Sequence, residues 1–212
     1  MAEIVVHKPA YRITVGKAYF ADYNAVADTF SSDVVAVESI KEIGIALEKS
    51  SSTIYASGIT YDTTNQKTGE AISIDAVQLP IDLVSKYLGE SSTSQSADKG
   101  LTYVKVNDKS PDFAFGYSVE YSDGKKLFKW YPRCKLITAD ETVATRDESA
   151  ADPSASYEVI AMPKDKVISF KYDQSLVDPL YVPHDEAKFF SSVVYKATDT
   201  TLIGTEELVS AG

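Results

Sequence analysis

PDFAFGYSVEYSDGKKLFKWYPRCKLITADETVAT, residues 111–145, is the stretch that decides the fold. From Phe113 to Tyr121, large apolar residues alternate with small or polar ones, which is the period-two pattern of a β-strand. The tripeptide Ser-Asp-Gly at residues 122–124 is a tight-turn signal, and a second strand pattern follows it. The sequence therefore predicts a β-hairpin at the centre of the chain.

The return strand is predicted to have two unlike faces. One face is apolar and carries Phe128, Trp130, Cys134 and Leu136. The other carries three basic residues, Lys129, Arg133 and Lys135, together with Tyr131. Pro132 lies between these residues and has no N–H for a strand ladder, so it indicates an edge position or a bulge.

Shorter patterns of the same kind recur along the chain. Further strands are predicted at residues 34–47, as one strand or a bent pair, and at residues 54–61, 70–79, 157–162 and 167–172. A polar hairpin tip is predicted at residues 62–69 and an acidic polar loop at residues 140–153. If residues 34–47 formed one unbroken strand, Glu38, Glu42 and Glu48 would share a face. Ile43, Ile45 and Leu47 would then lie on the opposite face.

One helix is predicted at residues 80–89. Pro80 suits the first turn, Asp82 complements the helix dipole there, and Gly89 is a C-terminal stop signal. Ile81, Val84 and Leu88 would form its apolar stripe. A second, short helix is expected at residues 184–194.

Many short strands, few helices and no βαβ rhythm predict a mainly β protein. The expected architecture is a β-sandwich or small barrel with a flanking α-helix and long loops or extended arms. We expect an N-terminal arm at residues 1–10, one β domain at residues 11–195 and a flexible C-terminal tail at residues 196–212.

The charge balance restricts the class of partner. The chain has 21 basic and 31 acidic residues among 212, a formal net charge of −10. Such a surface repels nucleic acid and anionic membranes instead of binding them. With Cys134 as the single cysteine, no intramolecular disulfide can form, which favours synthesis in a reducing cytoplasm.

The sequence contains no arrangement typical of catalysis. His7 and His184 are the only histidines, and no G-x-S-x-G, G-x-G-x-x-G or P-loop motif is present. His184 beside Asp185 and Glu186 could form half of a metal site, but acidic residues at a helix start are the more ordinary explanation. We therefore expect no enzyme, no metal and no cofactor.

The chain resembles the major tail proteins, or tail tube proteins, of the phi13-like group of long-tailed phages of Gram-positive hosts. The resemblance spans residues 11–195. Its blocks are VGKAYF at 15–20, LVSKYLG at 83–89, FAFGY at 113–117, SDGKK at 122–126, FKWY at 128–131 and CKL at 134–136, followed by Glu141, Thr145 and Glu148. Cys134 departs from the group, in which a small residue such as glycine is usual at this position.

The resemblance implies a structural virion protein that self-assembles into hexameric rings. The rings would stack into a hollow tail tube, through which genomic DNA passes into the host without specific binding. Implied partners are further copies of the chain, the tape measure protein, the tail terminator or connector, and baseplate proteins. The protein would be made in the bacterial host cytoplasm and end in the virion tail.

Three groups of residues are candidates for assembly and transport. Acidic residues expected to face the lumen are Glu38, Glu42, Glu48 and Asp75. Basic residues expected to meet acidic groups of a neighbouring subunit are Lys129, Arg133 and Lys135. Residues expected in loops between rings are Asp62, Asn65, Lys67, Glu141, Arg146 and Asp147.

Other functions stay open at this point. A tube protein of a contractile or phage-derived particle would share the same features. A non-catalytic β-sandwich carbohydrate-binding module would need an exposed aromatic platform, whereas the strongest aromatic pattern here indicates a core. A glycoside hydrolase with paired carboxylates has no supporting feature in the sequence.

Overall fold

The computed structural model describes residues 10–56, 59–92, 101–141, 154–179 and 181–196. The N-terminal arm and the C-terminal tail expected from the sequence lie outside these residues, except for residues 10 and 196. Most of the acidic loop at residues 140–153 lies outside them as well.

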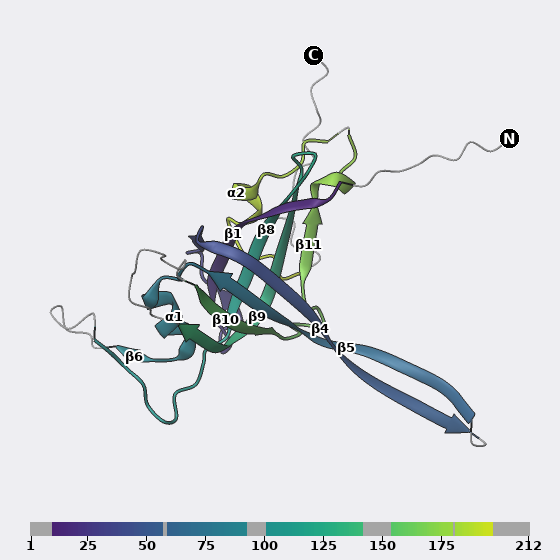
Figure 1. Cartoon of the computed structure of the whole chain (residues 1–212), viewed down its shortest axis with the longest axis horizontal. Coiled ribbons are helices and arrows are strands. Elements are labelled where there is room, and N and C mark those ends of the chain that lie inside the picture. The colour runs from purple at the N-terminus through teal and green to yellow at the C-terminus, as the bar shows by residue number, and fades with distance from the viewer. Residues whose placement is uncertain (1–9, 57–58, 93–100, 142–153, 180, 197–212) are drawn as a thin grey trace, which may run out of the picture.

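The described residues form a mainly β protein, as predicted (Figure 1). The strands are β1 Arg12–Asn24, β2 Thr29–Phe30, β3 Val35–Val37, β4 Ile40–Ala56, β5 Ile59–Ala76, β6 Ser91–Ser92, β7 Thr102–Tyr103, β8 Phe113–Tyr121, β9 Lys126–Glu141, β10 Ala155–Ala161 and β11 Phe170–Asp173. The helices are α1 Ile81–Leu88, the 3-10 turn η1 Gln174–Leu176 and α2 Glu186–Phe189.

One antiparallel sheet organises the molecule. Its order is β2-β1-β8-β9-β10-β5-β4, with β3 pairing to β1 and β11 pairing to β9. The first core, one apolar cluster, takes side chains from β1, β3, β5, β8, β9 and β10, and β1 also contacts β4. The sheet therefore curls around this core as an open barrel.

The central hairpin is confirmed. β8 and β9 pair from Phe113 to Glu120, and Gly124 in the turn has a φ of 79°, which favours glycine. Pro132 lies at a register shift of this pairing, as its missing N–H predicted. On the other side of β9, β11 pairs up to Trp130 and β10 pairs from Cys134 onward, so Pro132 falls between two partner strands.

The bulge at Pro132 makes one prediction wrong. Trp130 and Cys134 do not share a face: Trp130 packs in a second core, whereas Cys134 belongs to the first. An extra residue in a strand reverses the in–out alternation beyond it. The prediction treated the strand as unbroken and therefore placed Trp130, before Pro132, on the same face as Cys134, after it.

The second core lies on the outer face of β1, β8 and β9. The segment from α2 to Tyr195 covers it, with Phe190 stacked on Tyr19 at a centroid distance of 3.7 Å. A Cβ at Gly116 would lie 2.8 Å from the Phe190 ring and from Trp130, so glycine is needed for this close approach. β8 is consequently buried on both faces over most of its length.

Helix α1 begins and ends where the sequence predicted. Gly89 adopts the left-handed conformation with φ 82° and caps the helix end. The predicted stripe is wrong at Ile81, which is exposed, while Leu83 and Tyr87 are buried. Because Tyr87 stacks on Phe113 at 4.2 Å, the helix is turned to place this aromatic pair in the core.

The long hairpin β4–β5 differs from the expectation of two strands joined by a tip at residues 62–69. Ala56 of β4 pairs with Ile59 of β5, and residues 62–69 continue along β5 instead of forming a hairpin tip. The predicted bend in residues 34–47 is confirmed as the break between β3 and β4.

The second core should contribute strongly to stability. We predict that Phe190→Ala lowers the free energy of unfolding by about 3 kcal/mol or more, because a buried aromatic ring is replaced by a cavity. Urea unfolding followed by fluorescence of Trp130, the only tryptophan, measures this. Leu176→Ala, at an exposed position, is the control and should change stability by less than about 0.5 kcal/mol. A loss below about 1 kcal/mol for Phe190→Ala would mean that the segment is loosely held.

Candidate assembly surfaces

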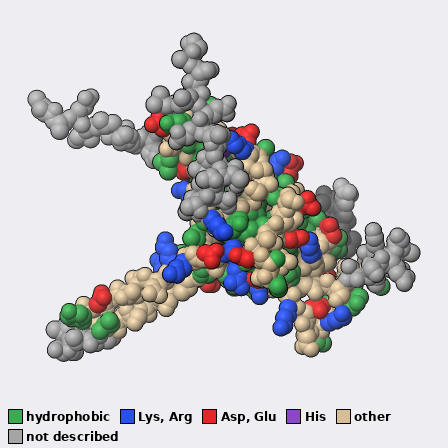
Figure 2. Space-filling view, turned by 180° about the vertical axis from the view of Figure 1, so that it is seen from behind, with side chains coloured by type: hydrophobic (Ala, Val, Ile, Leu, Met, Phe, Trp, Pro, Cys, Tyr) green, Lys and Arg blue, Asp and Glu red, His purple; other side chains and the backbone are tan. Residues whose placement is uncertain are grey.

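The distal half of the β4–β5 hairpin projects away from the barrel (Figure 1). β10 pairs with β5 only from Ala76 to Glu70. Beyond this point, residues 49–67 form a ribbon whose two strands pair with each other, and no other described strand pairs with them. Figure 2 shows mostly uncharged polar surface along the ribbon, with basic side chains gathered where it leaves the body.

The ribbon has little to stabilise it within one chain. A two-stranded hairpin without a covering layer is marginally stable in water. Lys49 and Lys67 lie directly opposite each other in it, and like charges in that position repel. Both of its edges also present backbone N–H and C=O groups that can pair with another chain.

Three of the residues expected between rings lie on this ribbon. Asp62 is opposite Ile54, Asn65 is opposite Ser51 and Lys67 is opposite Lys49. They are strand residues and do not belong to a loop. Of the other three, Glu141 is the last residue of β9 and its side chain lies outside the described part, as do Arg146 and Asp147 entirely.

A row of acidic residues crosses the outer face of the sheet. The pairing registers place Glu42 of β4, Asp75 of β5, Ser156 of β10 and Asp140 of β9 side by side. Glu158 lies two residues further along β10 on the same face. Among the described residues, none of these four carboxylates forms a salt bridge within 4.0 Å, so the face carries unneutralised negative charge.

The structure brings together most of the acidic residues expected at a lumen. Glu42, Glu48 and Asp75 share this face, and Ile43 lies on the opposite one, as the alternation predicted. Glu38 is separate, because it lies in the connection between β3 and β4 and pairs with Lys17 at 2.6 Å. This exposed pair raises the pKa of Lys17 through the hydrogen bond and charge of Glu38.

Sequence reasoning missed Asp140 and Glu158. Asp140 was assigned to a loop, although it belongs to β9. Glu158 alternates with the buried residues Tyr157 and Val159, and that alternation was the available signal. Their place beside Glu42 and Asp75 depends on strand order, which one sequence does not reveal.

The three basic residues do not form one face. Lys129 points to the barrel side, where its Nζ lies 2.8 Å from Glu70 Oε2 and its side chain is only 14% exposed. Beyond the bulge, Arg133 and Lys135 lie on the outer side and approach Asp112 at 2.8 and 3.5 Å. Each is thus paired within its own chain, so any contact with a neighbour would have to share or exchange these partners.

Glu70 of β5 forms a small polar network with two side chains of β9 on the barrel side of the sheet. Its carboxylate accepts hydrogen bonds from Lys129 Nζ and from the Tyr131 hydroxyl. Burial raises the pKa of Glu70, but these two hydrogen bonds together with the charges of Lys129 and Lys67 lower it, so the net shift is below the ordinary value of 4.5. Burial also raises the pKa of the Tyr131 hydroxyl, so this group stays protonated and donates its hydrogen bond to Glu70.

The other candidate chemical groups have structural roles. Cys134 is fully buried, and burial raises the pKa of its thiol, which disfavours the reactive thiolate. Asp185 caps α2 by accepting from Lys188 N at 2.6 Å, and Glu186 accepts from Tyr19, Ser118 and Lys126.

Within the described residues, no group of three or more His, Cys, Asp or Glu side chains is placed to hold a metal. None of the described helices has the length and apolar character needed to cross a membrane.

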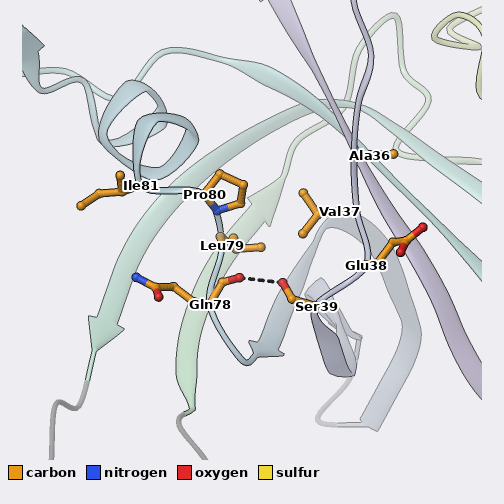
Figure 3. Close-up of a pocket in the computed structure, with 8 residues that line it drawn as sticks. All are labelled: Ala36, Val37, Glu38, Ser39, Gln78, Leu79, Pro80 and Ile81. Carbon is orange, nitrogen blue, oxygen red and sulfur yellow. Dashed lines mark hydrogen bonds between the residues drawn. The ribbon is translucent and has the colours of Figure 1, made fainter. Parts of the chain in front are cut away.

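A shallow groove lies beside the start of α1 (Figure 3). Its lining residues are Ala36, Val37, Glu38, Ser39, Gln78, Leu79, Pro80 and Ile81. The Ser39 hydroxyl donates to the Gln78 carbonyl at 2.6 Å, and Val77 N donates to the Ser39 carbonyl at 2.9 Å. These bonds join the two chain segments that form the floor of the groove.

Comparisons with known proteins add little to this description. No protein-family model matches the sequence, and no curated protein matches it. A solved structure described as "Cryo-EM structure of the anti-feeding prophage (AFP) baseplate, 6-fold symmetrised" contains a similar chain. The match covers 79% of this chain and 97% of that one, with 6% identity and a TM-score of 0.43. A likeness this loose says nothing about function.

The Glu70 network makes a prediction about pH. Because the pKa of Glu70 is lowered in the folded chain, its stabilising effect is present above its ordinary pKa and is lost as the pH falls through the lowered value. Glu70→Gln should therefore cost about 1–2 kcal/mol of unfolding free energy at pH 7, and the difference from wild type should shrink towards pH 3. Urea unfolding at a series of pH values measures it.

The control is Glu158→Gln, which removes an exposed carboxylate outside any described salt bridge. It should leave both the stability and its pH dependence nearly unchanged. A difference for Glu70→Gln that stays constant down to pH 3 would show that the carboxylate charge is not what matters.

Proposed function

We propose that this chain is a structural, non-catalytic virion protein of a phage tail, whose copies assemble into stacked hexameric rings that form the tail tube. The projecting ribbon at residues 49–67 is the observation that carries the proposal. An isolated ribbon of this length is poorly stable, whereas pairing or packing against another copy would satisfy the backbone groups at its edges. The resemblance of the sequence blocks at residues 11–195 supports the same function.

Ring formation is supported by the form of the sheet. β4 lies at one end of the strand order and β2 at the other, so each copy has two different sheet ends. A contact between two different surfaces repeats from copy to copy and closes into a ring when the rotation allows. Extending a sheet across such a contact is an established mode of protein association.

The acidic outer face supports the role as a conduit. A lumen lined by Glu42, Asp75, Asp140 and Glu158 would repel DNA phosphates, so that DNA slides without binding. Under this proposal Glu48 lies on the same face near the base of the ribbon, whereas Glu38 lies apart from it.

The proposal extends to partners and location. The tube would contact the tape measure protein during assembly, the tail terminator or connector at one end and the baseplate at the other. The protein would be made in the host cytoplasm and act in the virion, with residues 11–195 as the folded domain and both chain ends as arms. Lys129, Arg133 and Lys135 would meet a neighbouring subunit only by exchanging their present acidic partners.

The same geometry would serve a tube protein of a contractile or phage-derived particle, so this alternative remains within the proposal. A carbohydrate-binding module is disfavoured, because the largest aromatic side chains, such as Trp130, Phe115 and Tyr131, are fully buried. Negative-stain electron microscopy of the concentrated protein tests the proposal directly. Tubes or six-fold rings are expected, and a monomer that binds glycans in a screen would refute it.

Removing the ribbon should abolish assembly and spare the fold. We predict that replacing residues 51–65 with Asn-Gly, a two-residue hairpin turn, gives monomers at concentrations where wild type forms rings or tubes. Sedimentation velocity and electron microscopy measure this. The deletion removes no residue of either core, so its unfolding free energy should stay within about 1 kcal/mol of wild type. Tubes of normal appearance from the shortened chain would contradict the role of the ribbon.

The acidic face should determine whether DNA adheres. We predict that Glu42→Lys together with Glu158→Lys gives a protein that binds short duplex DNA at least about tenfold more tightly than wild type at low salt. The binding should weaken steeply as salt is added, since phosphate contacts release counterions. Fluorescence anisotropy of labelled DNA measures it.

The matched control carries the same change in net charge elsewhere. Asp33→Lys with Asp82→Lys alters two exposed acidic residues outside this face, on the β2–β3 connection and on α1. If it binds DNA as tightly as the first variant, only net charge matters and the acidic face has no special role.

A further inference from the structure

The segment that covers the second core is held differently from the strands beneath it. We define the strap as residues 185–196, which begin at the N-cap of α2 and lie along the outer face of β1, β8 and β9 (Figure 1). No described strand pairs with the strap. Its backbone is linked to the sheet through a side chain, the Trp130 indole N–H, which donates to the Phe189 carbonyl at 3.4 Å. A segment outside the hydrogen-bonded ladder can open at a lower free energy than the strands it covers.

The core of the barrel is complete without the strap. Among the described residues, the first core takes none from positions 185–196. The strap contributes its apolar side chains to the second core, where they lie over an aromatic face that includes Tyr19, Phe128 and Trp130. Opening of the strap would therefore uncover one apolar face and leave the first core closed.

Glu186 fastens the start of the strap. Its carboxylate accepts hydrogen bonds from the Tyr19 hydroxyl at 2.8 Å, the Ser118 hydroxyl at 2.7 Å and the Lys126 ammonium at 2.6 Å. The three donors belong to β1, β8 and β9, so one side chain ties the strap to three strands. Hydrogen bonds to an ionised group are stronger than those between neutral groups. Glu186 is thus a polar latch that acts in addition to apolar packing.

Lys164 fastens the end of the strap. Its side chain is only 5% exposed, and its ammonium lies 5.6 Å from the centre of the Tyr195 ring and 5.3 Å from that of Tyr23. The same ammonium donates a hydrogen bond to the Asp28 carboxylate. Tyr195 also packs on Phe30 at a centroid distance of 4.9 Å. This second latch therefore joins the strap to the β1–β2 turn.

The backbone around the second latch is strained. Asp28, Asp165 and Lys166 have φ angles of 52°, 50° and 68°, and no other non-glycine residue in the described part of the chain has a positive φ. Lys164 contacts both aspartates, and it pairs with Val167 across the turn at residues 165–166. Such backbone persists only where its surroundings hold it, and it clusters at clamps and switches. Its gathering around Lys164 points to a conformational role for this contact.

We propose that residues 185–196 form a releasable strap, which the Glu186 and Lys164 latches hold closed and which opens as one unit while the barrel stays folded. In the closed state the strap masks the aromatic face of Tyr19, Phe128 and Trp130, and in the open state this face is accessible. Opening takes place within a single chain, so it does not depend on the proposed function.

Labelling of two buried thiols tests whether the strap opens alone. Ala114→Cys places a thiol under the strap, and the native Cys134 in the first core is the internal reference. Reaction with N-ethylmaleimide in the absence of denaturant, followed by peptide mass spectrometry, measures both rates. The thiol at position 114 should react at least about tenfold faster than Cys134, because strap opening exposes the first and global unfolding is needed to expose the second. Equal rates would mean that the strap opens only with the barrel, which overturns the proposal.

Two further positions guard against a fault of the first variant. Ala21→Cys lies opposite Ala114 in the β1–β8 pairing and replaces it if Ala114→Cys does not fold. Val193→Cys places the thiol on the strap itself and should react within about threefold of the rate at position 114, since a unit opens as a whole. Fast reaction at position 193 with slow reaction beneath the strap would show fraying of the segment end and would contradict opening as a unit.

Lys164→Met and Glu186→Gln test the latches. Each should raise the labelling rate at position 114 by about fivefold or more and leave that of Cys134 within about twofold, because each removes a charged partner of the closed state. The control is Lys171→Met, which removes an exposed lysine whose partner Asp173 lies outside the strap, and it should change neither rate. Unchanged labelling at position 114 in both latch variants overturns the latches. An equal rise at both thiols shows unfolding of the whole chain and overturns independent opening.

Discussion

Burial of β8 on both faces is the constraint on which the rest of the structure depends. Toward the barrel, Phe113, Phe115 and Tyr117 join the first core, and toward the outside, Ala114 and Gly116 contact the second. Small residues must therefore alternate with aromatic ones, since the C-terminal segment approaches the outer face too closely for larger side chains. This requirement explains why β8 carries the strongest alternation in the chain, and why the layers on both sides of it are aromatic.

Local signals predicted the parts of the fold that depend on local chemistry. The turn at residues 122–124, the C-terminal stop of α1 at Gly89 and the mainly β class were all available from the sequence. The errors arose where pairing overrides local pattern. The bulge at Pro132 reversed the face of Trp130 relative to Cys134, and the stacking of Tyr87 on Phe113 turned Ile81 outward. Neither packing choice follows from the spacing of apolar residues alone.

The candidate surfaces were predictable to a smaller extent. Alternation placed Glu42, Glu48 and Asp75 on one face, because all three lie in uninterrupted parts of paired strands. It could not bring Asp140 and Glu158 beside them, since these come from strands more than 60 residues further along the chain. The ribbon was misplaced for a related reason: Ser- and Thr-rich sequence is typical of loops, and only a long register of pairing can hold it in strands.

The net charge of this chain opposes the association of its copies. A formal net charge of −10 per copy makes copies repel at long range, which opposes association at low salt. Any stable assembly must therefore rely on short-range contacts, and the ribbon at residues 49–67 offers backbone pairing of that kind. The ribbon contributes no residue to the two cores, so a single copy can fold without it. Under the proposed function, folding and association would belong to different parts of the molecule, so that a subunit could reach its native structure before it meets a second copy.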